Sequence, residues 1–371
     1  MRVLVVNAGS SSLKLRLLDA HDTIDHGADL PAGPHGFDTS RLADVLQGWT
    51  KPDVVGHRIV HGGTVFTGPV RITDAVREQL QSLTDLAPLH QPKSLAALDA
   101  LTAQLPDVTA VASFDTAFHT TIPAAAATYA VPLEWRNRYA IRRYGFHGLS
   151  HAYCSHRAAE LLDRPLDGLR IVTCHLGAGA SLAAVVDGRS VDTTMGFTPL
   201  EGLVMATRSG TVDPGLVLWL EEHEHLSPHE VATALEQRSG LTALAGTGDM
   251  REVEAAAQRG DPAAALGLEV YIHRLVSGIG AMSAATGGAD VLVFTGGVGE
   301  HSAIVRRRAV ERLGFLGLAI DVHRNDTVHD DSDITAPGAT VRTLVIAARE
   351  DLQIAREARR LLVTTSRRRD R

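Results

Sequence analysis

The chain has 371 residues, of which 44% are hydrophobic and 21% charged, and this length and composition predict a globular protein with two domains. Its 36 Lys and Arg against 43 Asp and Glu give a formal net charge of −7, which argues against a nucleic-acid partner, because such a partner requires a basic excess. The two cysteines, Cys154 and Cys174, lack CxxC spacing, which argues against zinc or iron–sulfur centres and favours a reducing compartment.

The chain begins with a predicted β-hairpin. Residues 3–6 form a continuous apolar run, and residues 13–18 alternate apolar side chains with Lys14 and Arg16. The first run stops at Asn7, which is too early for a signal peptide, and nowhere do eighteen apolar residues follow one another. We therefore expect no membrane partner and a cytoplasmic location.

A strand that carries a buried charge comes next. Residues 20–53 are rich in Asp, His, Gly and Pro, so we expect a loop-dominated connection with a short helix near 39–49. Residues 54–63 are typical of a buried strand followed by a turn, and they include Arg58. A buried arginine needs an anion, so Arg58 indicates either a ligand site or a structural ion pair.

A helix and a second buried strand follow. Leucines at 95, 98, 101 and 105 predict an amphipathic helix over 92–105. Residues 108–114 then predict a strand that ends at Asp115. In open α/β sheets the end of a strand is the usual position for a carboxylate that contacts a metal or a substrate.

The opening pattern recurs in the middle of the chain. Residues 171–176 and 182–187 predict two strands, and the small-residue turn 177–181 joins them as the turn 7–12 joins the first pair. One such unit in each half of the chain indicates a duplicated architecture with two similar domains.

The remaining elements alternate between helix and strand. We expect helices over 266–285, 302–313 and 351–362, and strands over 291–294 and 341–346, with a Gly-rich loop at 295–299. Alternating strands and helices after two leading hairpins predict α/β domains with mixed sheets.

Three small-residue turns follow predicted strands, at 7–12, 177–181 and 296–299. Turns without side-chain bulk let a phosphate approach the backbone N–H groups, although hairpin turns are rich in the same residues for purely structural reasons. The sequence has neither GxxxxGK[ST] nor GxGxxG spacing at these turns, so a nucleotide would bind between the hairpins.

Polar residues in small or apolar surroundings complete the pattern: Arg58, Asp115, His147, Arg208 and Glu350. His147 is flanked by glycines but could be a structural histidine, and Glu350 could equally be an acidic residue in the first turn of a helix. No GxSxG or HExxH motif occurs. Two arginines, two carboxylates and a histidine suit magnesium-assisted phosphoryl transfer.

Ten segments in order make the chain resemble the acetate kinase family, which includes propionate and butyrate kinases and belongs to the actin, sugar kinase and heat-shock chaperone superfamily. The segments are NAGSSSLK (7–14), GHRIVHGG (56–63), LAPLHQP (86–92), FDTAFH (114–119), RRYGFHGLSH (142–151), HLGAGAS (175–181), TPLEGLVMATRSGTVDPG (198–215), GDMRE (248–252), FTGGVGEHSA (294–303) and AREDLQIARE (348–357).

The resemblance implies an α/β fold of two duplicated actin-like (ribonuclease H-like) domains with mixed sheets and an interdomain nucleotide cleft. It implies an N-terminal acyl-substrate and phosphate domain over 1–146 plus the helix 351–371, and a nucleotide-binding, dimerising domain over 147–350. The implied reaction is reversible, direct in-line transfer of the γ-phosphoryl of ATP to acetate or another short-chain carboxylate, giving ADP and acetyl phosphate on a route to acetyl-CoA. Mg²⁺, with Mn²⁺ as an alternative, is the implied cofactor, and a homodimer is the implied assembly.

The resemblance also implies roles for single residues. The catalytic residues would be Arg58, Asp115, His147 and Arg208, and the metal would be held by Asn7 and Glu350. The acyl substrate would contact Arg58, Val60, Leu89, His90, Phe146 and Pro199. The nucleotide and its phosphates would contact Asn7, Ser10, Ser12, Lys14, His175, Gly177, Gly179, Ser181, Asp249, Met250, Arg251, Gly297, Val298 and Gly299.

Three positions depart from the family's pattern. Ala178 stands where Asn is usual, His301 stands where Asn commonly follows Gly-Glu, and Arg349 stands where Asn commonly precedes the glutamate. Three alternatives stay open: a preference for propionate or butyrate, a phosphoryl donor such as pyrophosphate, and a silent nucleotide-binding member of the superfamily. Retention of Arg58, Asp115, His147, Arg208 and Glu350 argues against the silent member.

Overall fold

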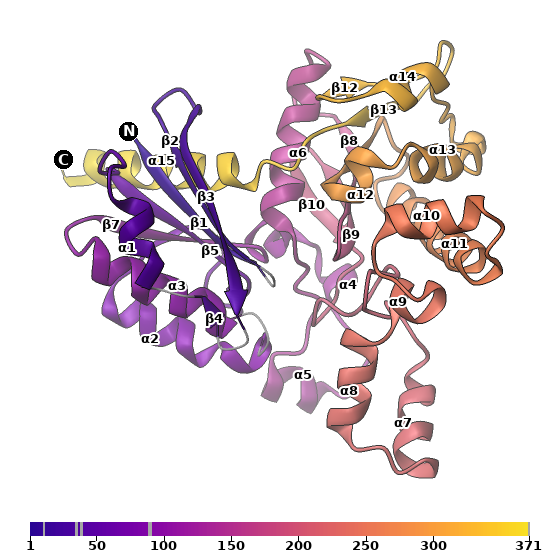
Figure 1. Cartoon of the computed structure of the whole chain (residues 1–371), viewed down its shortest axis with the longest axis horizontal. Coiled ribbons are helices and arrows are strands. Elements are labelled where there is room, and N and C mark those ends of the chain that lie inside the picture. Colours follow the sequence, from indigo (N-terminus) through magenta and orange to yellow (C-terminus); the bar gives the residue numbers. More distant parts are fainter. Residues whose placement is uncertain (10–11, 34–35, 38–39, 88–90, 370–371) are drawn as a thin grey trace. The chain divides into compact units, whose positions relative to one another are not determined.

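The computed structural model describes residues 1–9, 12–33, 36–37, 40–87 and 91–369 (Figure 1). The chain divides into two compact units. Unit 1 comprises Met1–Thr120, Gly148–Tyr153 and Arg349–Arg371, and unit 2 comprises Thr121–His147 and Cys154–Ala348. Helix α6 (Gly148–Leu161) begins in unit 1 and continues in unit 2.

Unit 1 is built on a seven-stranded mixed sheet in the order β4-β3-β2-β1-β5-β7-β6. β1, β2 and β3 form an antiparallel meander, whereas β1, β5 and β7 run parallel. The strands are β1 (Val3–Ala8), β2 (Ser12–Leu18), β3 (Ile24–Gly33), β4 (Gly36–Phe37), β5 (Val54–Ile59), β6 (Val70–Arg71) and β7 (Thr109–Phe114).

Helices cover both faces of this sheet. Because successive side chains on a strand point to opposite faces, Leu4, Val6 and Val55 pack with α3 and α1, while Gly56 faces the other way. A Cβ at Gly56 would lie 2.6 Å from Ile354, so α15 packs directly on this part of the sheet. In Figure 1, α15 lies on one side of these strands and α1 to α3 lie on the other. The helices are α1 (Ser40–Leu46), α2 (Asp74–Ser82), α3 (Gln91–Gln104) and α15 (Glu350–Arg369), with 3₁₀ turns at Thr84–Leu86 and Ala117–Thr121.

Unit 2 repeats the same strand arrangement. Its six-stranded sheet has the order β10-β9-β8-β11-β13-β12, in which β8, β9 and β10 form the antiparallel meander and β8, β11 and β13 run parallel. Apart from β4, each strand has a counterpart at the same position in unit 1. The strands are β8 (Arg170–Leu176), β9 (Ala180–Val186), β10 (Arg189–Thr193), β11 (Val291–Thr295), β12 (Ser332–Asp333) and β13 (Arg342–Val345).

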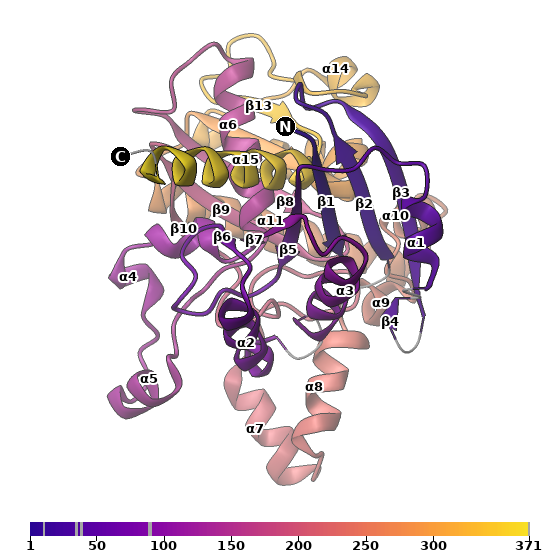
Figure 2. The same cartoon turned by 90° about the vertical axis from the view of Figure 1, so that its left-hand side faces the viewer.

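The long helix α11 (Pro262–Ala285) packs on β9 and β10, and α9 and α10 pack on α11. Helices α7 and α8 lie side by side in both views (Figures 1 and 2). The other helices of unit 2 are α4 (Ala124–Ala127), α5 (Leu133–Tyr139), α7 (Pro214–His223), α8 (Pro228–Gln237), α9 (Gly240–Ala245), α10 (Met250–Gln258), α12 (Gly296–His301), α13 (Ala303–Glu311) and α14 (Val322–Thr327), with a 3₁₀ turn at Gly314–Leu316. Across the described ranges, no helix combines the length and hydropathy needed to span a membrane.

The duplicated α/β fold with mixed sheets is confirmed, but two elements differ from prediction. Residues 24–33, expected to be a loop, form β3, because they pair along β2 from Ser12 to Leu18. The segment 296–299, expected to be a loop, is the first part of α12. Its helical form follows from Gly296, whose positive φ of 77° lets the chain turn from β11 into the helix.

Residues 121–147 contact the rest of unit 2, and the predicted domain boundary at residue 146 stays a prediction. Residues 121–147 belong to unit 2, where the Arg143 guanidinium donates to the carbonyls of Thr193, Thr194 and Met195. The N–H groups of Tyr144 and Gly145 both donate to the carbonyl of Gly196. These hydrogen bonds tie the segment to the end of β10, which the composition of the segment did not indicate.

Candidate active site

Four polar residues of unit 1 meet where its parallel strands end, and we call them the Arg58 cluster: Asn7, Arg58, Asp115 and Glu350. Asn7 lies in β1, Arg58 lies in the adjacent β5, and Asp115 directly follows β7. Glu350 is the first residue of α15. The carboxyl ends of parallel strands share one edge of a sheet, so three of these residues converge for topological reasons.

A hydrogen-bond network connects the Arg58 cluster. Arg58 Nε donates to Asp115 Oδ1 at 3.0 Å, and Arg58 Nη2 forms a second, shorter contact with Asp115 Oδ2. Arg58 Nη1 donates to Asn7 Oδ1 at 3.2 Å, and Asn7 Nδ2 donates to Glu350 Oε2 at 3.0 Å. Glu350 Oε2 also lies 3.8 Å from Arg58 Nε. The bidentate pair with Asp115 fixes the plane of the guanidinium.

Burial and charge act against each other in this cluster. The side chain of Asp115 is 1% exposed and that of Arg58 is 14% exposed. Burial opposes the charge of Arg58, but the two neighbouring carboxylates outweigh it and raise the pKa of Arg58. Burial raises the pKa of Asp115 to about 6, and the adjacent Arg58 guanidinium counteracts this rise. Two carboxylates face one guanidinium, so the cluster has acidic oxygens to spare for a cation.

The oxygen atoms of the Arg58 cluster are of the kind that binds a hard cation. Asn7, Asp115 and Glu350 supply amide and carboxylate oxygens, the ligands that Mg²⁺ prefers. Within the described ranges, no group of three or more His, Cys, Asp and Glu residues forms a ready metal cage. Mg²⁺ commonly keeps several waters and uses one or two carboxylates together with substrate phosphates, so a sparse protein donor set is compatible with it.

Other residues expected at this end of unit 1 are only partly placed. Lys14 is the cross-strand partner of Asn7, so both side chains lie on one face of the hairpin. Ser12 begins β2, and Val60 is buried just beyond β5. Three further predicted residues, Ser10, Leu89 and His90, lie outside the described residues.

A second group, which we call the Arg208 cluster, lies in unit 2: His147, His175, Ser181 and Arg208. His147 Nδ1 lies 2.8 Å from Ser181 Oγ, and its ring stacks on that of His175 with centroids 4.3 Å apart. A Cβ at Gly179 would lie 3.1 Å from Arg208 Nη2 and 3.3 Å from His147 Nε2. Both side chains therefore converge over this glycine.

Arg208 is a cation without a carboxylate partner. Its Nη1 donates to the carbonyl of Pro199 at 2.8 Å, and among the described residues its guanidinium forms no salt bridge with an Asp or Glu. Burial lowers the pKa of Arg208, and the more distant Glu236 only partly offsets this effect. A partly buried guanidinium in such surroundings is stabilised by an incoming anion.

Phe146 and Pro199, expected to contact the acyl group, are both connected to the Arg208 cluster. Phe146 is its neighbour in sequence, and Pro199 is hydrogen-bonded to it. Phe146 is 1% exposed and immediately precedes His147, which adopts a left-handed backbone with φ of 56° at the start of α6. Pro199 contributes its carbonyl to Arg208. The sequence placed Phe146 and Pro199 in one acyl pocket with Val60, which belongs to unit 1, and that grouping stays a prediction.

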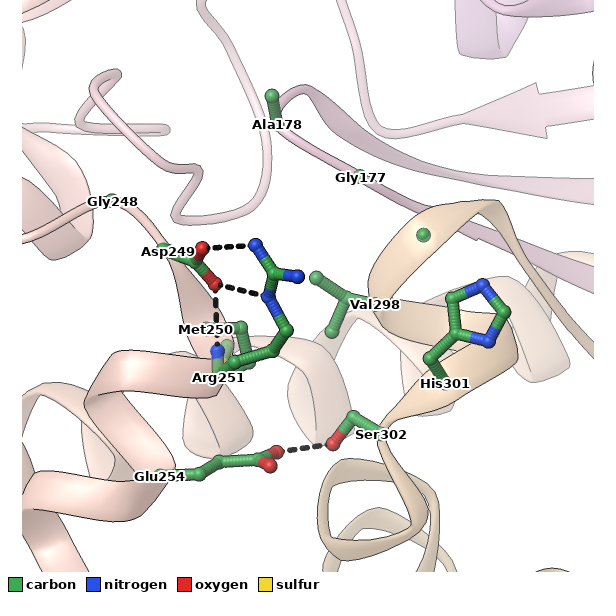
Figure 3. A pocket seen from close by; sticks show the side chains of 11 residues that line it. Gly177, Ala178, Gly248, Asp249, Met250, Arg251, Glu254, Val298, His301 and Ser302 are labelled. Atoms are coloured by element: carbon green, nitrogen blue, oxygen red, sulfur yellow. Dashed lines mark hydrogen bonds and ion pairs between the residues drawn. The ribbon is translucent and has the colours of Figure 1, made fainter.

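Unit 2 also contains a pocket of about 510 Å³, which we call the α12 pocket (Figure 3). Three segments form it: the β8–β9 turn, the start of α10, and α12 with the residue that follows it. The lining residues are Gly177, Ala178, Gly248, Asp249, Met250, Arg251, Glu254, Gly297, Val298, His301 and Ser302.

The start of α10 supplies the polar wall of the α12 pocket. Asp249 is the N-cap of α10 and accepts from the backbone N–H of Arg251 at 2.9 Å. The Arg251 side chain folds back on the same carboxylate, with Nε 3.0 Å from Oδ1 and Nη2 2.5 Å from Oδ2. These hydrogen bonds lower the pKa of Asp249 to about 2. Figure 3 shows this pair facing Val298.

Six of the residues expected at the nucleotide do line this pocket: Gly177, Asp249, Met250, Arg251, Gly297 and Val298. Gly299, within α12, is buried against the backbone of Phe294, whereas His175, Gly179 and Ser181 lie at the Arg208 cluster instead. Sequence reasoning had singled out Ala178 and His301 only as departures from a pattern, and both are lining residues.

Three lining residues were missed: Gly248, Glu254 and Ser302. Ser302 caps α13 by accepting from the N–H of Val305, and its hydroxyl donates to the Glu254 carboxylate. Ser302 directly follows α12, and Glu254 lies one turn along α10 from Met250. Residues four apart on a helix share a face, so the position of Met250 indicates that Glu254 faces the same pocket.

Comparison with known proteins gives a consistent assignment. A model of the acetokinase family matches residues 37–356. The chain is 44% identical to an acetate kinase of Nostoc punctiforme, over 98% of this chain and 100% of the relative. It is 45% identical to an acetate kinase of Clavibacter michiganensis, over 96% and 98%.

Solved structures give the same result. A Porphyromonas gingivalis acetate kinase superposes with a TM-score of 0.89 at 36% identity, covering 97% of this chain and 99% of the other. A Francisella tularensis propionate kinase superposes with a TM-score of 0.90 at 35% identity, over the same shares. The family model covers well over half of the chain, and the relatives cover nearly all of it. The chain therefore belongs to the acetokinase family.

Proposed function

We propose that this protein is an enzyme that transfers the γ-phosphoryl group of ATP to acetate and catalyses the reverse reaction. The observation that carries the proposal is Arg208, a partly buried guanidinium that converges with His147 and has no carboxylate partner in the described ranges. Family membership supplies the reaction, because the similar proteins are named acetate kinases.

We assign the nucleotide to unit 2. The α12 pocket, at about 510 Å³, has the size of a small-molecule site, and each of its three segments supplies a glycine, namely Gly177, Gly248 and Gly297. The base and ribose would contact Asp249, Met250, Arg251, Gly297 and Val298. The phosphates would approach Gly177 and Gly179, with His175 and Ser181 at the Arg208 cluster.

We assign the acceptor and the metal chiefly to unit 1. Arg58 would bind the acetate carboxylate, and Val60, Phe146 and Pro199 would contact its methyl group. Mg²⁺, when bound by Asn7 and Glu350 together with substrate phosphates, would neutralise charge on the phosphoryl oxygens. Asp115 fixes the guanidinium plane of Arg58 through its bidentate hydrogen bonds and keeps that group charged.

The reaction does not need a general base. An acetate oxygen attacks the γ-phosphorus while the bond from that phosphorus to the bridging β–γ oxygen breaks, and ADP leaves with the bonding electrons. No proton has to move, because the nucleophile is already a carboxylate. Catalysis therefore rests on position and on donors that meet the phosphoryl oxygens, here Arg208 and His147.

The choice of acid is a separate question. One methylene in an apolar pocket changes discrimination by only about 1–3 kcal/mol, so propionate remains a second candidate substrate. The structural similarity to a propionate kinase favours keeping it. Pyrophosphate as donor is less favoured, because it would leave the Asp249 and Arg251 wall of the α12 pocket without a ligand.

The test is acyl phosphate formation, trapped as hydroxamate, for acetate, propionate and butyrate with ATP and with pyrophosphate. We expect Mg²⁺-dependent turnover with ATP and acetate, and a loss of about 100-fold or more in kcat for Arg208→Ala. Arg274→Ala, at an exposed position of α11, is the control and should keep full activity. Tight ADP binding without carboxylate-dependent turnover would indicate a silent nucleotide-binding protein instead.

We also propose a cytoplasmic homodimer that acts on the route to acetyl-CoA. Helix α7 supports the dimer, because none of its ten residues is buried even though several are apolar. Leu216, Leu218 and Trp219 are 45%, 57% and 46% exposed. Exposed large apolar side chains gathered on one short helix are typical of a protein interface. Sedimentation equilibrium should give twice the chain mass of 39.5 kDa, and a monomer at micromolar concentration would contradict the dimer.

A further inference from the structure

We propose that Glu300 is a positioning residue that links the α12 pocket to the backbone immediately before Glu350. The proposal rests on the assignment of the α12 pocket to the nucleotide. Glu300 lies on α12 between two lining residues, Val298 and His301, but is not itself part of the lining. Its carboxylate points to the backbone instead.

One oxygen of Glu300 accepts two backbone hydrogen bonds. Glu300 Oε1 lies 2.9 Å from the N–H nitrogen of Gly296, the first residue of α12. The same oxygen lies 2.9 Å from the N–H nitrogen of Ala348. Gly296 and Ala348 are far apart in the sequence, so this single atom joins the start of α12 to the end of the segment that follows β13.

The bond to Gly296 replaces an ordinary helix cap. In α7, α8, α10, α11, α13 and α14 the N-cap side chain accepts a hydrogen bond from the first turn of its own helix. In α12 the N-cap Thr295 makes no such bond, and its buried hydroxyl has no hydrogen-bond partner among the described residues. A carboxylate from within the helix takes over the cap, and the same oxygen reaches Ala348.

The bond to Ala348 lies at the point where the chain leaves unit 2. Ala348 is the last residue of unit 2 in this segment, and Glu350 follows two positions later as the first residue of α15. A change in the position of α12 is therefore transmitted through one hydrogen bond to the backbone that carries Glu350. Because one oxygen accepts from both N–H groups, removal of the carboxylate releases the start of α12 and Ala348 together.

The other end of α12 is fixed independently. Arg306, 1% exposed, donates from Nη1 to the carbonyls of Gly299 at 2.9 Å and Glu300 at 2.7 Å. This anchor keeps α12 formed when the Glu300 side chain is shortened. Variants at Glu300 should therefore fold, and their effect should be confined to the start of α12 and the segment at Ala348.

The neighbouring residue Asp331 offers a matched control. Asp331 Oδ1 accepts from the N–H of Ala347 at 2.9 Å, and Asp331 Oδ2 pairs with Arg157 Nε at 2.6 Å. Asp331 thus holds the same segment as Glu300 but is neither part of α12 nor bonded to it. Asp331→Ala should loosen the segment without disturbing the α12 pocket.

The experiment is hydrogen exchange of the peptide over 345–349, with and without saturating ADP in EDTA, after calorimetry has given the ADP affinity. In the wild-type protein ADP should slow exchange at Ala348 about tenfold. Glu300→Ala should abolish this slowing and weaken ADP binding about tenfold. Glu300→Gln should keep both, because its amide oxygen can still accept, and Asp331→Ala should keep the ADP affinity within twofold.

Steady-state kinetics provide a second measurement. Glu300→Ala should raise the KM for ATP and the Mg²⁺ concentration for half-maximal rate, while the KM for acetate stays within twofold. Equal ADP-induced slowing in Glu300→Ala and wild-type protein would overturn the link. So would an ADP affinity that falls as much in Asp331→Ala as in Glu300→Ala. No ADP binding by the wild-type protein would overturn the proposed function, and the link with it.

Discussion

At the scale of single residues, the buried pair Arg58 and Asp115 is the clearest case of a charge that the fold has to balance. Removing one member of a buried pair leaves the other uncompensated, at a cost of about 3–5 kcal/mol. We expect Asp115→Ala to lower the free energy of unfolding by about 3 kcal/mol, near the low end because Glu350 still faces Arg58. Urea unfolding at pH 7.5 measures this change.

The surface pair Arg77 and Asp99 is the control for that prediction. Its geometry is also bidentate, with both nitrogen–oxygen distances at 2.7 Å, but the Asp99 side chain is 52% exposed. Solvent screening makes such a pair worth about 1 kcal/mol or less. Similar losses for Asp99→Ala and Asp115→Ala would show that burial does not distinguish the two pairs.

Much of the Arg58 cluster could be predicted from the sequence, and the reason is chemical. An arginine inside an apolar run and an aspartate at the end of another are rare enough to attract attention, and both lie where expected. Glu300 could not be recognised in this way, because a glutamate in a helix is common and its partner Ala348 offers only a backbone N–H group. Hydrogen bonds to the backbone leave no signature in the partner's side chain.

At the scale of elements, the β8–β9 turn positions the Arg208 cluster through the absence of a side chain. A methyl group on Gly179 would approach Arg208 Nη2 to 3.1 Å and His147 Nε2 to 3.3 Å, so one of them must shift. We expect Gly179→Ala to lower kcat about tenfold or more, because small displacements of catalytic groups are costly. The hydroxamate assay measures this change in kcat.

Gly280 in α11 is the control for the turn. A Cβ there meets nothing within 4 Å, so Gly280→Ala should keep kcat and stabilise the helix by about 0.5–1 kcal/mol. An unchanged kcat in Gly179→Ala would mean that Arg208 and His147 do not need their observed positions.

The hairpins were predictable as elements, whereas β3 was not. β1, β2, β8 and β9 have continuous or alternating apolar patterns that local periodicity detects. β3 contains Gly27 and Pro31, residues that disfavour strands, and its pairing with β2 overrides that preference. Likewise, the glycines of α12 have low helix propensity, and the helix persists because Glu300 and Arg306 fix its two ends.

At the scale of the whole molecule, the repeated strand order places a candidate ligand site after the parallel strands of each unit. In unit 1 the cluster follows the parallel strands β1, β5 and β7, and in unit 2 the α12 pocket follows their counterparts β8 and β11. The duplication was visible in the two hairpins alone. The contact of residues 121–147 with unit 2 was not visible, because it depends on side-chain hydrogen bonds from Arg143.

Stability of the whole molecule should depend on pH through two buried histidines. Burial lowers the pKa of His57, 1% exposed, and of His61, 0% exposed, to about 4, from an ordinary value of 6.5. Above pH 6.5 both histidines are neutral in the folded and unfolded chains, so their contribution is fully present. As the pH falls from 6.5 towards 4, the unfolded chain binds protons that the folded chain does not, and stability is lost.

The size of the effect follows from linkage. Each histidine should lower the free energy of unfolding by about 2 kcal/mol between pH 8 and pH 5. In urea titrations, His57→Leu should reduce the loss of unfolding free energy between these two pH values by about 2 kcal/mol. The buried position of His57 in β5 suits an apolar side chain. His229→Leu, at an exposed position of α8, should leave this loss unchanged. If His57→Leu and wild-type protein lose equal stability between pH 8 and pH 5, then His57 accepts its proton in the folded state as readily as in the unfolded chain.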